Sequence, residues 1–274
     1  MSQELKYGVR SEISDSAHIN ELQYDLLYRQ SIEQPELFWA EQANKYLFWF
    51  KKWEKVTSYD FQSGEISWFE GGKINASYNC LDRHLEKWGD QIAIFWEDDN
   101  GSESRQISYV ALHEEVCQFA NVLKSRGVEK GDRVSIYMPM IPEAVIAMLA
   151  CGRIGAIHSV VFGGFASNEL ASRIDDSKAK VIVTASCGFE PGKTVEYKPL
   201  VDAAIKMATH KIDKMILFQR IDHTVELNAP KEISWGEALS NAKEVDCVEM
   251  NSNDLAYILY TSGTTGVPKG IVRD

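Results

Sequence analysis

Apolar and polar positions follow two different periods along most of this chain. Short apolar runs predict buried strands, and the segments between them repeat apolar residues every three or four positions, as one face of a helix does. Strands are expected at 92–96, 133–138, 156–161, 180–184, 214–218 and 255–260, and helices at 109–126, 142–153, 167–176, 197–208 and 235–242. Because the two alternate, the pattern predicts βαβ crossovers and an α/β fold, with mostly parallel sheets covered by helices.

Residues that favour helix ends support these boundaries. Ser108 and Ser167 are expected N-caps, because a serine hydroxyl accepts a hydrogen bond from a free N–H of the first turn. Pro142 suits the first turn of its helix, and Gly127 suits the residue after a helix end.

The first 85 residues have a different character. Residues 1–20 are polar and unpatterned and are expected to be disordered. A helical pattern begins near Tyr24, and Pro35 fits the first turn of a second helix. The aromatic run 46–50 predicts a packing patch rather than a ligand box. The pair Gly71-Gly72 predicts a turn, and a capped helix is expected from about residue 82 to 87.

Composition and charge exclude several classes of function. A formal net charge of -11 argues against a nucleic-acid-binding surface, which needs a basic face. The chain has no run of 18 apolar residues, and its first residues lack the apolar core of a secretory signal. The five cysteines are odd in number and widely spaced, so they predict buried reduced thiols rather than disulfides or a zinc site.

The densest group of candidate binding residues follows the last predicted strand. The loop combines hydroxyls, glycines and a lysine: Thr261, Ser262, Gly263, Thr264, Thr265, Gly266 and Lys269. Glycines let backbone N–H groups turn toward an anion, and the hydroxyls and ammonium add donors for phosphate oxygens. Pro268 stands where a Walker A loop needs its second glycine, five positions after Gly263, so this is a different phosphate loop. The alternative is a plain polar turn.

Three further positions lie where strands are expected to end. The segment Val161–Ser167 joins a strand to a helix, at the sheet edge where ligands collect, although an ordinary turn explains it equally well. His158 is expected to be a packed strand residue rather than a catalytic one, and Cys187 an inert thiol rather than a nucleophile.

The loop sequence Tyr-Thr-Ser-Gly-Thr-Thr-Gly-Val-Pro-Lys-Gly at 260–270 resembles the phosphate-binding signature of the adenylate-forming enzymes. The segments 26–39, 68–75 and 77–84 resemble the leader of acetyl- and propionyl-CoA synthetases. The resemblance implies a leader at 21–85. It also implies that residues 86–274 form the N-terminal portion of the large adenylate-forming domain, with its C-terminal half and the small C-terminal domain absent.

The resemblance also implies roles for particular residues. The phosphate loop would hold the β- and γ-phosphates of ATP, and Phe162, Gly163 and Gly164 would line the coenzyme A adenine site. In the family the loop corresponding to 184–194 often bears arginine near the CoA phosphates. Here Glu190 occupies such a position, which puts that role in doubt, while Lys193 keeps a positive charge.

The implied activity is ATP-dependent conversion of a short-chain carboxylate to an acyl-adenylate and then to acyl-CoA. ATP, Mg²⁺ and coenzyme A are the implied cofactors. The expected partners are small molecules, not nucleic acid or a membrane. The protein is expected in the cytoplasm, with the mitochondrial matrix as an open alternative. The segments 166–177, 197–203 and 270–274 favour propionate over acetate. We expect no catalytic or metal-binding residue within these 274 residues, which would form a truncated, inactive fragment. The alternative is a stand-alone nucleotide- or CoA-binding or interaction module.

Overall fold

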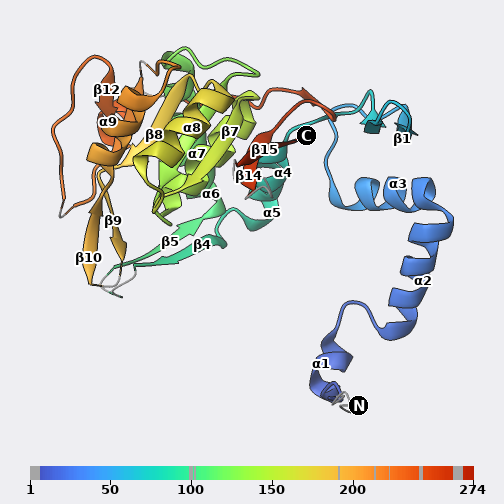
Figure 1. Cartoon of the computed structure of the whole chain (residues 1–274). Coiled ribbons are helices and arrows are strands. Elements are labelled where there is room, and N and C mark those ends of the chain that lie inside the picture. The colour runs from blue at the N-terminus through green and yellow to red at the C-terminus, as the bar shows by residue number, and fades with distance from the viewer. Residues whose placement is uncertain are drawn as a thin grey trace, which may run out of the picture. The chain divides into compact units, whose positions relative to one another are not determined.

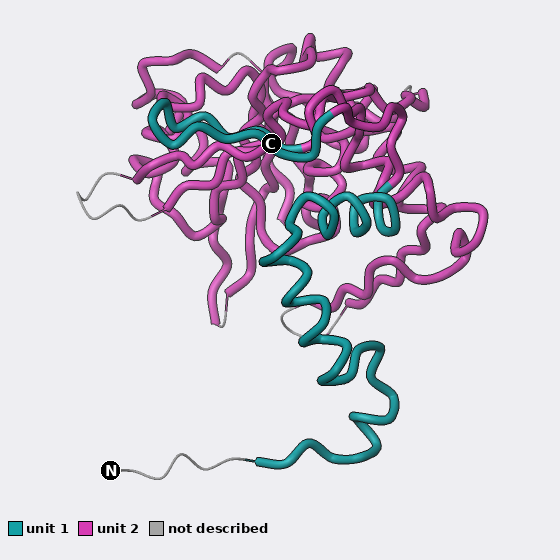
Figure 2. The backbone as a smooth tube through the Cα atoms, turned by 90° about the vertical axis from the view of Figure 1, so that its right-hand side faces the viewer, with its two compact units in different colours: residues 1–47, 55–68 teal, residues 48–54, 69–274 magenta. Residues whose placement is uncertain are grey.

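The structure is a computed structural model that describes residues 7–98, 101, 103–190, 192–212, 214–221, 223–240, 243–261 and 268–274. It divides into two compact units, one formed by residues 1–47 and 55–68 and the other by residues 48–54 and 69–274 (Figure 2). The leader segment predicted at 21–85 is therefore shared between the two units. No helix among the described residues is both long and apolar enough to span a bilayer.

The smaller unit is mainly helical. It contains α1 (Ser11–Ser16), α2 (Glu21–Glu33), α3 (Pro35–Tyr46) and the strand β1 (Lys55–Asp60), which pairs with β2 (Glu65–Glu70). Asn20 and Gln23 cap α2 reciprocally, each side chain accepting the backbone N–H of the other. Pro35 occupies the first turn of α3, as predicted. Helix α1 lies within the segment expected to be disordered, and none of its residues is buried.

The larger unit is built on a seven-stranded sheet. Its order is β12 (Glu232–Ser234), β11 (Met215–Phe218), β8 (Val181–Ala185), β6 (Arg133–Met138), β7 (Ile157–Phe162), β14 (Tyr257–Thr261) and β15 (Lys269–Arg273) (Figure 1). Every pair is parallel except the last, β14–β15, which is antiparallel. The predicted α/β class with a mostly parallel sheet is confirmed.

The order of connections places helices on both faces of this sheet. After α6 (Tyr109–Ser125), β6 leads through α7 (Pro142–Ile154) to its neighbour β7, and β7 leads back through α8 (Ser167–Ser177) across β6 to β8. Right-handed crossovers in opposite directions put α7 and α8 on opposite faces. The observed helix contacts agree, since α6 packs on α7, and α9 (Tyr197–Met207) packs on α8.

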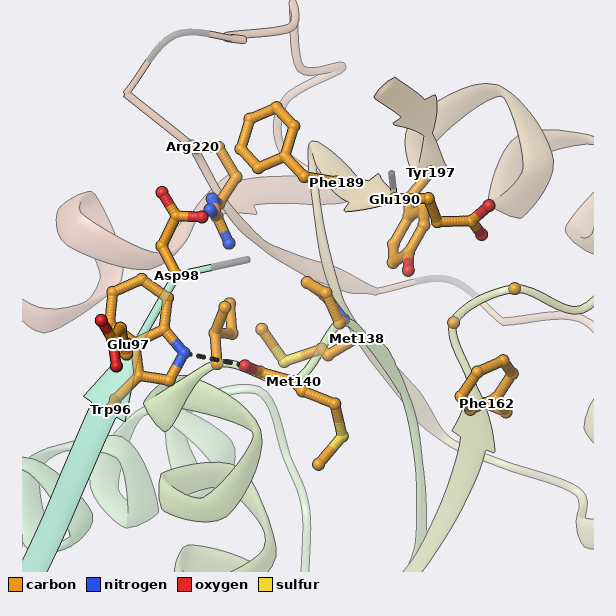
Figure 3. A pocket seen from close by; sticks show the side chains of 14 residues that line it. Trp96, Glu97, Asp98, Met138, Met140, Phe162, Phe189, Glu190, Tyr197 and Arg220 are labelled. Carbon is orange, nitrogen blue, oxygen red and sulfur yellow. Dashed lines mark hydrogen bonds between the residues drawn. The ribbon is translucent and has the colours of Figure 1, made fainter. Parts of the chain in front are cut away.

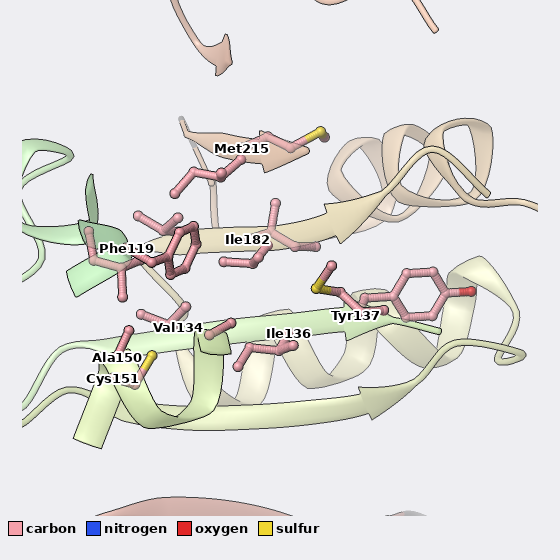
Figure 4. Close-up of a cluster of buried hydrophobic side chains, with 14 of the residues drawn as sticks. Phe119, Val134, Ile136, Tyr137, Ala150, Cys151, Ile182 and Met215 are labelled. Atoms are coloured by element: carbon pink, nitrogen blue, oxygen red, sulfur yellow. The ribbon is translucent and has the colours of Figure 1, made fainter. Parts of the chain in front are cut away.

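The core of this unit lies between the sheet and its helices (Figure 4). Phe119 of α6, Val134 and Ile136 of β6, and Ile182 of β8 are fully buried. Phe119 also stacks on Trp235, with 3.7 Å between ring centroids. Trp235 begins the short helix α10 (Trp235–Leu239), which ends earlier than the predicted 242. The apolar periodicity of the sequence therefore identified the residues that fill the core.

Three shorter pieces complete the larger unit. The strands β4 (Ile92–Glu97) and β5 (Ser104–Ser108) form an antiparallel hairpin, as do β9 (Cys187–Glu190) and β10 (Lys193–Glu196). Near the start of the unit, β3 (Lys73–Ile74) pairs with β13 (Met250–Asn251), followed by α4 (Ala76–Cys80), the 3-10 turn η1 (Asp82–His84) and α5 (Leu85–Trp88). The β9–β10 hairpin was not predicted, and it becomes important at the site.

A charged cluster joins three of these elements below the protein surface. Asp82 accepts two hydrogen bonds from the Arg153 guanidinium, at 2.8 and 3.0 Å, and lies 3.2 Å from His113 Nε2. Arg153 is 3% exposed. The bond to Asp82 raises the pKa of His113 to about 9, and the bonds from His113 and Arg153 hold the pKa of Asp82 at about 2 despite burial. Both charged forms are therefore stable at neutral pH.

Two predictions need correction. Ser108 caps α6 through its hydroxyl, but Ala166 occupies the N-cap of α8 and Ser167 is already the first helical residue. All five cysteines are free, but burial holds only for Cys117, Cys151 and Cys187, while Cys80 is exposed and Cys247 half-buried. Neither difference changes the fold class.

Candidate functional site

The carboxyl ends of the parallel strands meet at one edge of the sheet. Strands β6 and β7 run side by side, with Met138 opposite Phe162, and the chain then leaves them toward opposite faces through α7 and α8. Such a point of divergence leaves a crevice at the sheet edge, because no connecting segment crosses it. The topology therefore fixes where a ligand site is expected before any side chain is considered.

A cavity of about 140 Å³ occupies this position (Figure 3). Its floor runs from Met138, the last residue of β6, to Ile141. One wall is formed by Phe162, the last residue of β7, and by Gly163 and Gly164 of the turn that follows. Three residues predicted from the sequence to contact one ligand therefore line one cavity. Phe162 is 65% exposed, so most of its ring surface is available for contact with a ligand.

The remaining walls come from the two hairpins and from α9. Trp96 and Asp98 belong to the β4–β5 hairpin, and Phe189 and Glu190 to the β9–β10 hairpin. Trp96 is fixed there by its indole N–H, which donates to the Met140 carbonyl at 2.9 Å. Since β4, β6, β7 and β9 are separate in sequence, their folding brings aromatic and charged groups together around one space.

Tyr197, at the start of α9, forms the buried back wall. It is 5% exposed and packs against Tyr137, with 5.0 Å between ring centroids. Glycines make room for it, since a Cβ added at Gly188 would lie 2.5 Å from Tyr197 Oη and one at Gly163 would lie closer still. Figure 3 shows the hydroxyl pointing into the space between Met138 and Phe162. Burial raises the pKa of Tyr197, so the hydroxyl remains a neutral donor.

Arg220 enters the cavity just beyond the carboxyl end of β11. Its guanidinium lies 4.8 Å from the centre of the Phe189 ring and 6.0 Å from that of Trp96. Its backbone N–H donates to the Ser186 hydroxyl at 2.9 Å, which fixes the start of the side chain. Among the described residues, the guanidinium has neither an ion pair nor a hydrogen bond. The cavity therefore contains a cation whose donors are available to a ligand.

The loop cation expected from the sequence lies elsewhere. Lys193 is the first residue of β10, its side chain is 65% exposed, and its ammonium forms a 2.8 Å ion pair with Glu190. Glu190 lines the cavity and Lys193 does not. The structure thus brings Phe162, Gly163 and Gly164 together with Arg220 and Tyr197, and it places Lys193 outside their cavity.

The phosphate loop leaves the same edge of the sheet one strand further along. Thr261, the last residue of β14, pairs with Lys269, the first residue of β15. Strand β14 is parallel to β7 with Tyr257 opposite His158, so in the same register Thr261 is level with Phe162. Ser262, Gly263, Thr264, Thr265 and Gly266 lie outside the described residues. The two predicted binding segments therefore begin on adjacent strands, at the same level.

His158 lies at the opposite end of β7 from the cavity. It stacks on Tyr257 with 5.5 Å between ring centroids, and burial lowers its pKa to about 4. These features fit the predicted packed strand histidine. Among the described residues, no group of three or more His, Cys, Asp or Glu side chains has a metal-binding arrangement.

Sequence reasoning missed Trp96, Phe189, Tyr197 and Arg220. One signal was present for Arg220, which follows the predicted strand 214–218 and so had to lie near the carboxyl edge of a parallel sheet. The others depend on how the two hairpins fold over that edge, which no local pattern specifies.

Comparisons with known proteins agree with this architecture. Residues 81–274 match the family described as AMP-binding enzyme, and residues 24–80 match the acetyl-coenzyme A synthetase N-terminus. Acetyl-coenzyme A synthetase 2 of Pseudomonas aeruginosa is 49% identical over 269 residues, covering 97% of this chain and 41% of the relative. Acetyl-coenzyme A synthetase of Shewanella denitrificans is 47% identical over 274 residues, covering 97% of this chain and 42% of the relative.

A solved structure shows the same fold. Acetoacetyl-CoA synthetase from Streptomyces lividans superimposes with a TM-score of 0.83 at 23% identity, covering 96% of this chain and 39% of that one. The chain thus spans about two fifths of the length of the curated relatives it matches. Its phosphate-loop sequence, its leader and its sheet all lead to the same assignment: the chain belongs to the AMP-binding enzyme family, with the N-terminal segment of acetyl-coenzyme A synthetases.

Proposed function

We propose that this chain supplies the ATP-phosphate and coenzyme A contacts of an enzyme that activates a short-chain carboxylate. The observation that supports the proposal is the position of the two segments, since the cavity lined by Phe162 and the loop after Thr261 begin on the neighbouring parallel strands β7 and β14. Adjacent parallel strands lie about 5 Å apart. A nucleotide held by one segment and a thiol ligand held by the other would therefore meet at one sheet edge.

The reaction has two steps. A carboxylate oxygen attacks the α-phosphorus of ATP, whose bond to pyrophosphate breaks, and Mg²⁺ accompanies the nucleotide as part of the substrate. The sulfur of coenzyme A then attacks the acyl carbon and AMP leaves. In both steps the protein acts mainly by positioning its substrates and by neutralising charge.

The residues of this chain have binding roles in that scheme. Thr261, Ser262, Gly263, Thr264, Thr265, Gly266 and Lys269 would hold the pyrophosphate portion of ATP. Phe162, Gly163 and Gly164 would receive the adenine of coenzyme A, because an exposed aromatic ring beside two glycines lets a flat ring stack close to the backbone. Lys193, the other residue expected to bind coenzyme A, lies outside the cavity, and its charge is balanced by Glu190 at 2.8 Å.

Carboxylate-dependent exchange between ATP and pyrophosphate tests the proposal. The protein from the complete reading frame is assayed with acetate, propionate and butyrate, with the 274-residue chain beside it. The relatives' names indicate acetate, whereas the segments 166–177 and 197–203 favour propionate, so the faster substrate decides between them. If no carboxylate supports exchange in the folded protein, the proposed adenylation is wrong.

A second candidate is a module that only binds coenzyme A or a nucleotide. It is favoured by one observation, that aromatic rings, the Arg220 guanidinium and the Tyr197 side chain line one cavity of about 140 Å³. Calorimetric titration of coenzyme A into the 274-residue chain tests it. Saturable binding by the chain, with no exchange from any form of the protein, would support the module and contradict the enzyme.

A further inference from the structure

We propose that Arg220 is the residue that binds a phosphate of coenzyme A in this chain, in place of the loop at 184–194. The inference rests on the proposed function, because it assumes that coenzyme A occupies the cavity at the carboxyl ends of β6 and β7. It goes further by naming a specificity-determining residue that belongs to neither predicted binding segment.

The first argument is the state of the guanidinium. Arg220 lines the cavity, yet it has no ion pair or side-chain hydrogen bond among the described residues, although its ring contacts with Phe189 and Trp96 hold it in place. An arginine stacked on aromatic rings still presents its in-plane N–H groups. Those groups match two oxygens of a phosphate, and the bond is stronger than one between neutral groups.

The second argument is the state of the neighbouring loop. Glu190 brings a carboxylate to the cavity wall, and Lys193 is paired with it at 2.8 Å. That pair leaves the loop without net positive charge, so it offers a phosphate little attraction. A cation from another element is needed, and among the described residues that line the cavity Arg220 is the only lysine or arginine.

The third argument is the distribution of polar groups around the space. Arg220 and Tyr197 come from different sides of the cavity, and the Tyr197 hydroxyl points into it (Figure 3). Tyr197 is 5% exposed, and no hydrogen bond of its hydroxyl occurs among the described residues. A hydroxyl that borders the cavity can donate a hydrogen bond to a ligand. The cavity thus suits a ligand with an anionic group near Arg220 and an acceptor near Tyr197.

The carboxylates of the lining restrict where that anion can lie. Glu97 and Asp98 are on the same wall as Trp96, and a phosphate beside them would be repelled. Carboxylates instead accept hydrogen bonds from amino groups such as the exocyclic amine of adenine. Arg220 is the cation of the lining, so the phosphate is placed at its guanidinium and not beside Glu97 and Asp98.

A second cavity extends the space on the far side of Arg220. It measures about 240 Å³ and shares Trp96, Phe189 and Arg220 with the first. Arg220 is thus accessible from both spaces, so a ligand that extends from one into the other would pass its guanidinium.

The test is coenzyme A affinity, measured by calorimetry on the full chain. Arg220→Met should weaken binding about 10- to 100-fold, the usual loss for a hydrogen-bonded charged contact. Arg220→Lys should lose less, because it keeps the charge but not the planar fork. The exposed Lys206 on α9 provides a control of equal charge change, and Lys206→Met should bind like the wild type. Circular dichroism confirms that each variant is folded.

Two further measurements separate a phosphate contact from a structural role. Wild-type affinity should fall with added NaCl more steeply than that of Arg220→Met, because the variant has lost a charge contact that salt screens. Dephospho-coenzyme A identifies the phosphate. If Arg220→Met weakens the binding of coenzyme A and of dephospho-coenzyme A equally, Arg220 contacts the diphosphate. If it weakens the binding of the dephospho form less, Arg220 contacts the 3′-phosphate. Either result supports the proposal.

Two results would overturn it. One is wild-type affinity in a folded Arg220→Met chain, and the other is a larger loss from Lys193→Met than from Arg220→Met. Failure of the proposed function looks different, since the wild-type chain itself would then show no binding of coenzyme A.

Discussion

Removing the charge of Asp82 should destabilise the larger unit strongly and in a pH-dependent way. In the variant Asp82→Asn, the Arg153 guanidinium stays 3% exposed but loses the carboxylate that it contacts at 2.8 and 3.0 Å. Leaving one member of a buried ion pair without its partner costs about 3–5 kcal/mol. The Asp82 side chain is 15% exposed, so we expect a loss near the lower end, about 3 kcal/mol.

The pH dependence follows from His113. Its pKa rises from 6.5 to about 9 in the folded chain. Its contribution to the free energy of unfolding is therefore fully present below pH 6.5 and is lost as pH rises toward 9. The full difference corresponds to about 3 kcal/mol. The pKa of Asp82 falls from 3.8 to about 2, so its contribution is present above pH 3.8 and is lost as pH falls toward 2. Other groups titrate too, so the informative quantity is the difference between the two proteins.

Urea denaturation followed by tryptophan fluorescence at pH 6, 7, 8 and 9 measures this difference. The stability gap between wild type and Asp82→Asn should be largest at pH 6 and narrow toward pH 9, because the wild type loses the His113 contribution over that range. Glu237→Gln, an exposed change on α10, serves as the control for removing a carboxylate. A gap below about 1 kcal/mol, or one that stays constant with pH, would refute the reasoning.

Two other substitutions test packing and buried hydrogen bonds. Gly188→Ala places a Cβ 2.5 Å from the Tyr197 hydroxyl, so we expect a loss of about 1–3 kcal/mol in stability and weaker coenzyme A binding. Gly236→Ala, where the added Cβ has open space within α10, should neither destabilise the chain nor weaken binding. Asn75→Ala removes a buried amide that donates to the Gly152 and Val248 carbonyls at 2.9 Å each, so thermal unfolding should show a loss of about 2–4 kcal/mol, and an unchanged melting temperature would contradict this.

The central strands could be predicted from the sequence because each is a short apolar run that lies between two segments with helical periodicity. The strand at 133–138 was placed correctly at both ends, and the strand expected at 255–260 begins two residues later, at Tyr257. Buried parallel strands leave this signal because both of their faces are covered. The β9–β10 hairpin left none, since its four-residue strands are short and Cys187–Glu190 contains a glycine and a glutamate.

The candidate site was predictable only where local sequence and topology coincide. Phe162, Gly163 and Gly164 follow a strand directly, so their place at the carboxyl edge was a necessary consequence of the parallel sheet. Arg220 was harder, because its importance depends on the rings of Phe189 and Trp96, which reach it from two separate hairpins. Tyr197 was hidden for another reason, since it looks like an ordinary buried helix residue until the two glycines that accommodate it are known.

The topology also limits how independent the two proposed binding segments can be. Strand β7 pairs with β6 on one side and with β14 on the other, so its end borders both the cavity and the strand that carries Thr261. The Tyr260 hydroxyl donates to Asp176 of α8 at 2.6 Å, and α8 itself begins five residues after Phe162. A displacement of the turn at Gly163 would therefore be transmitted to β14 through both the sheet and the helix. If coenzyme A occupies the cavity as proposed, we expect its binding to be coupled to the position of β14 through these contacts.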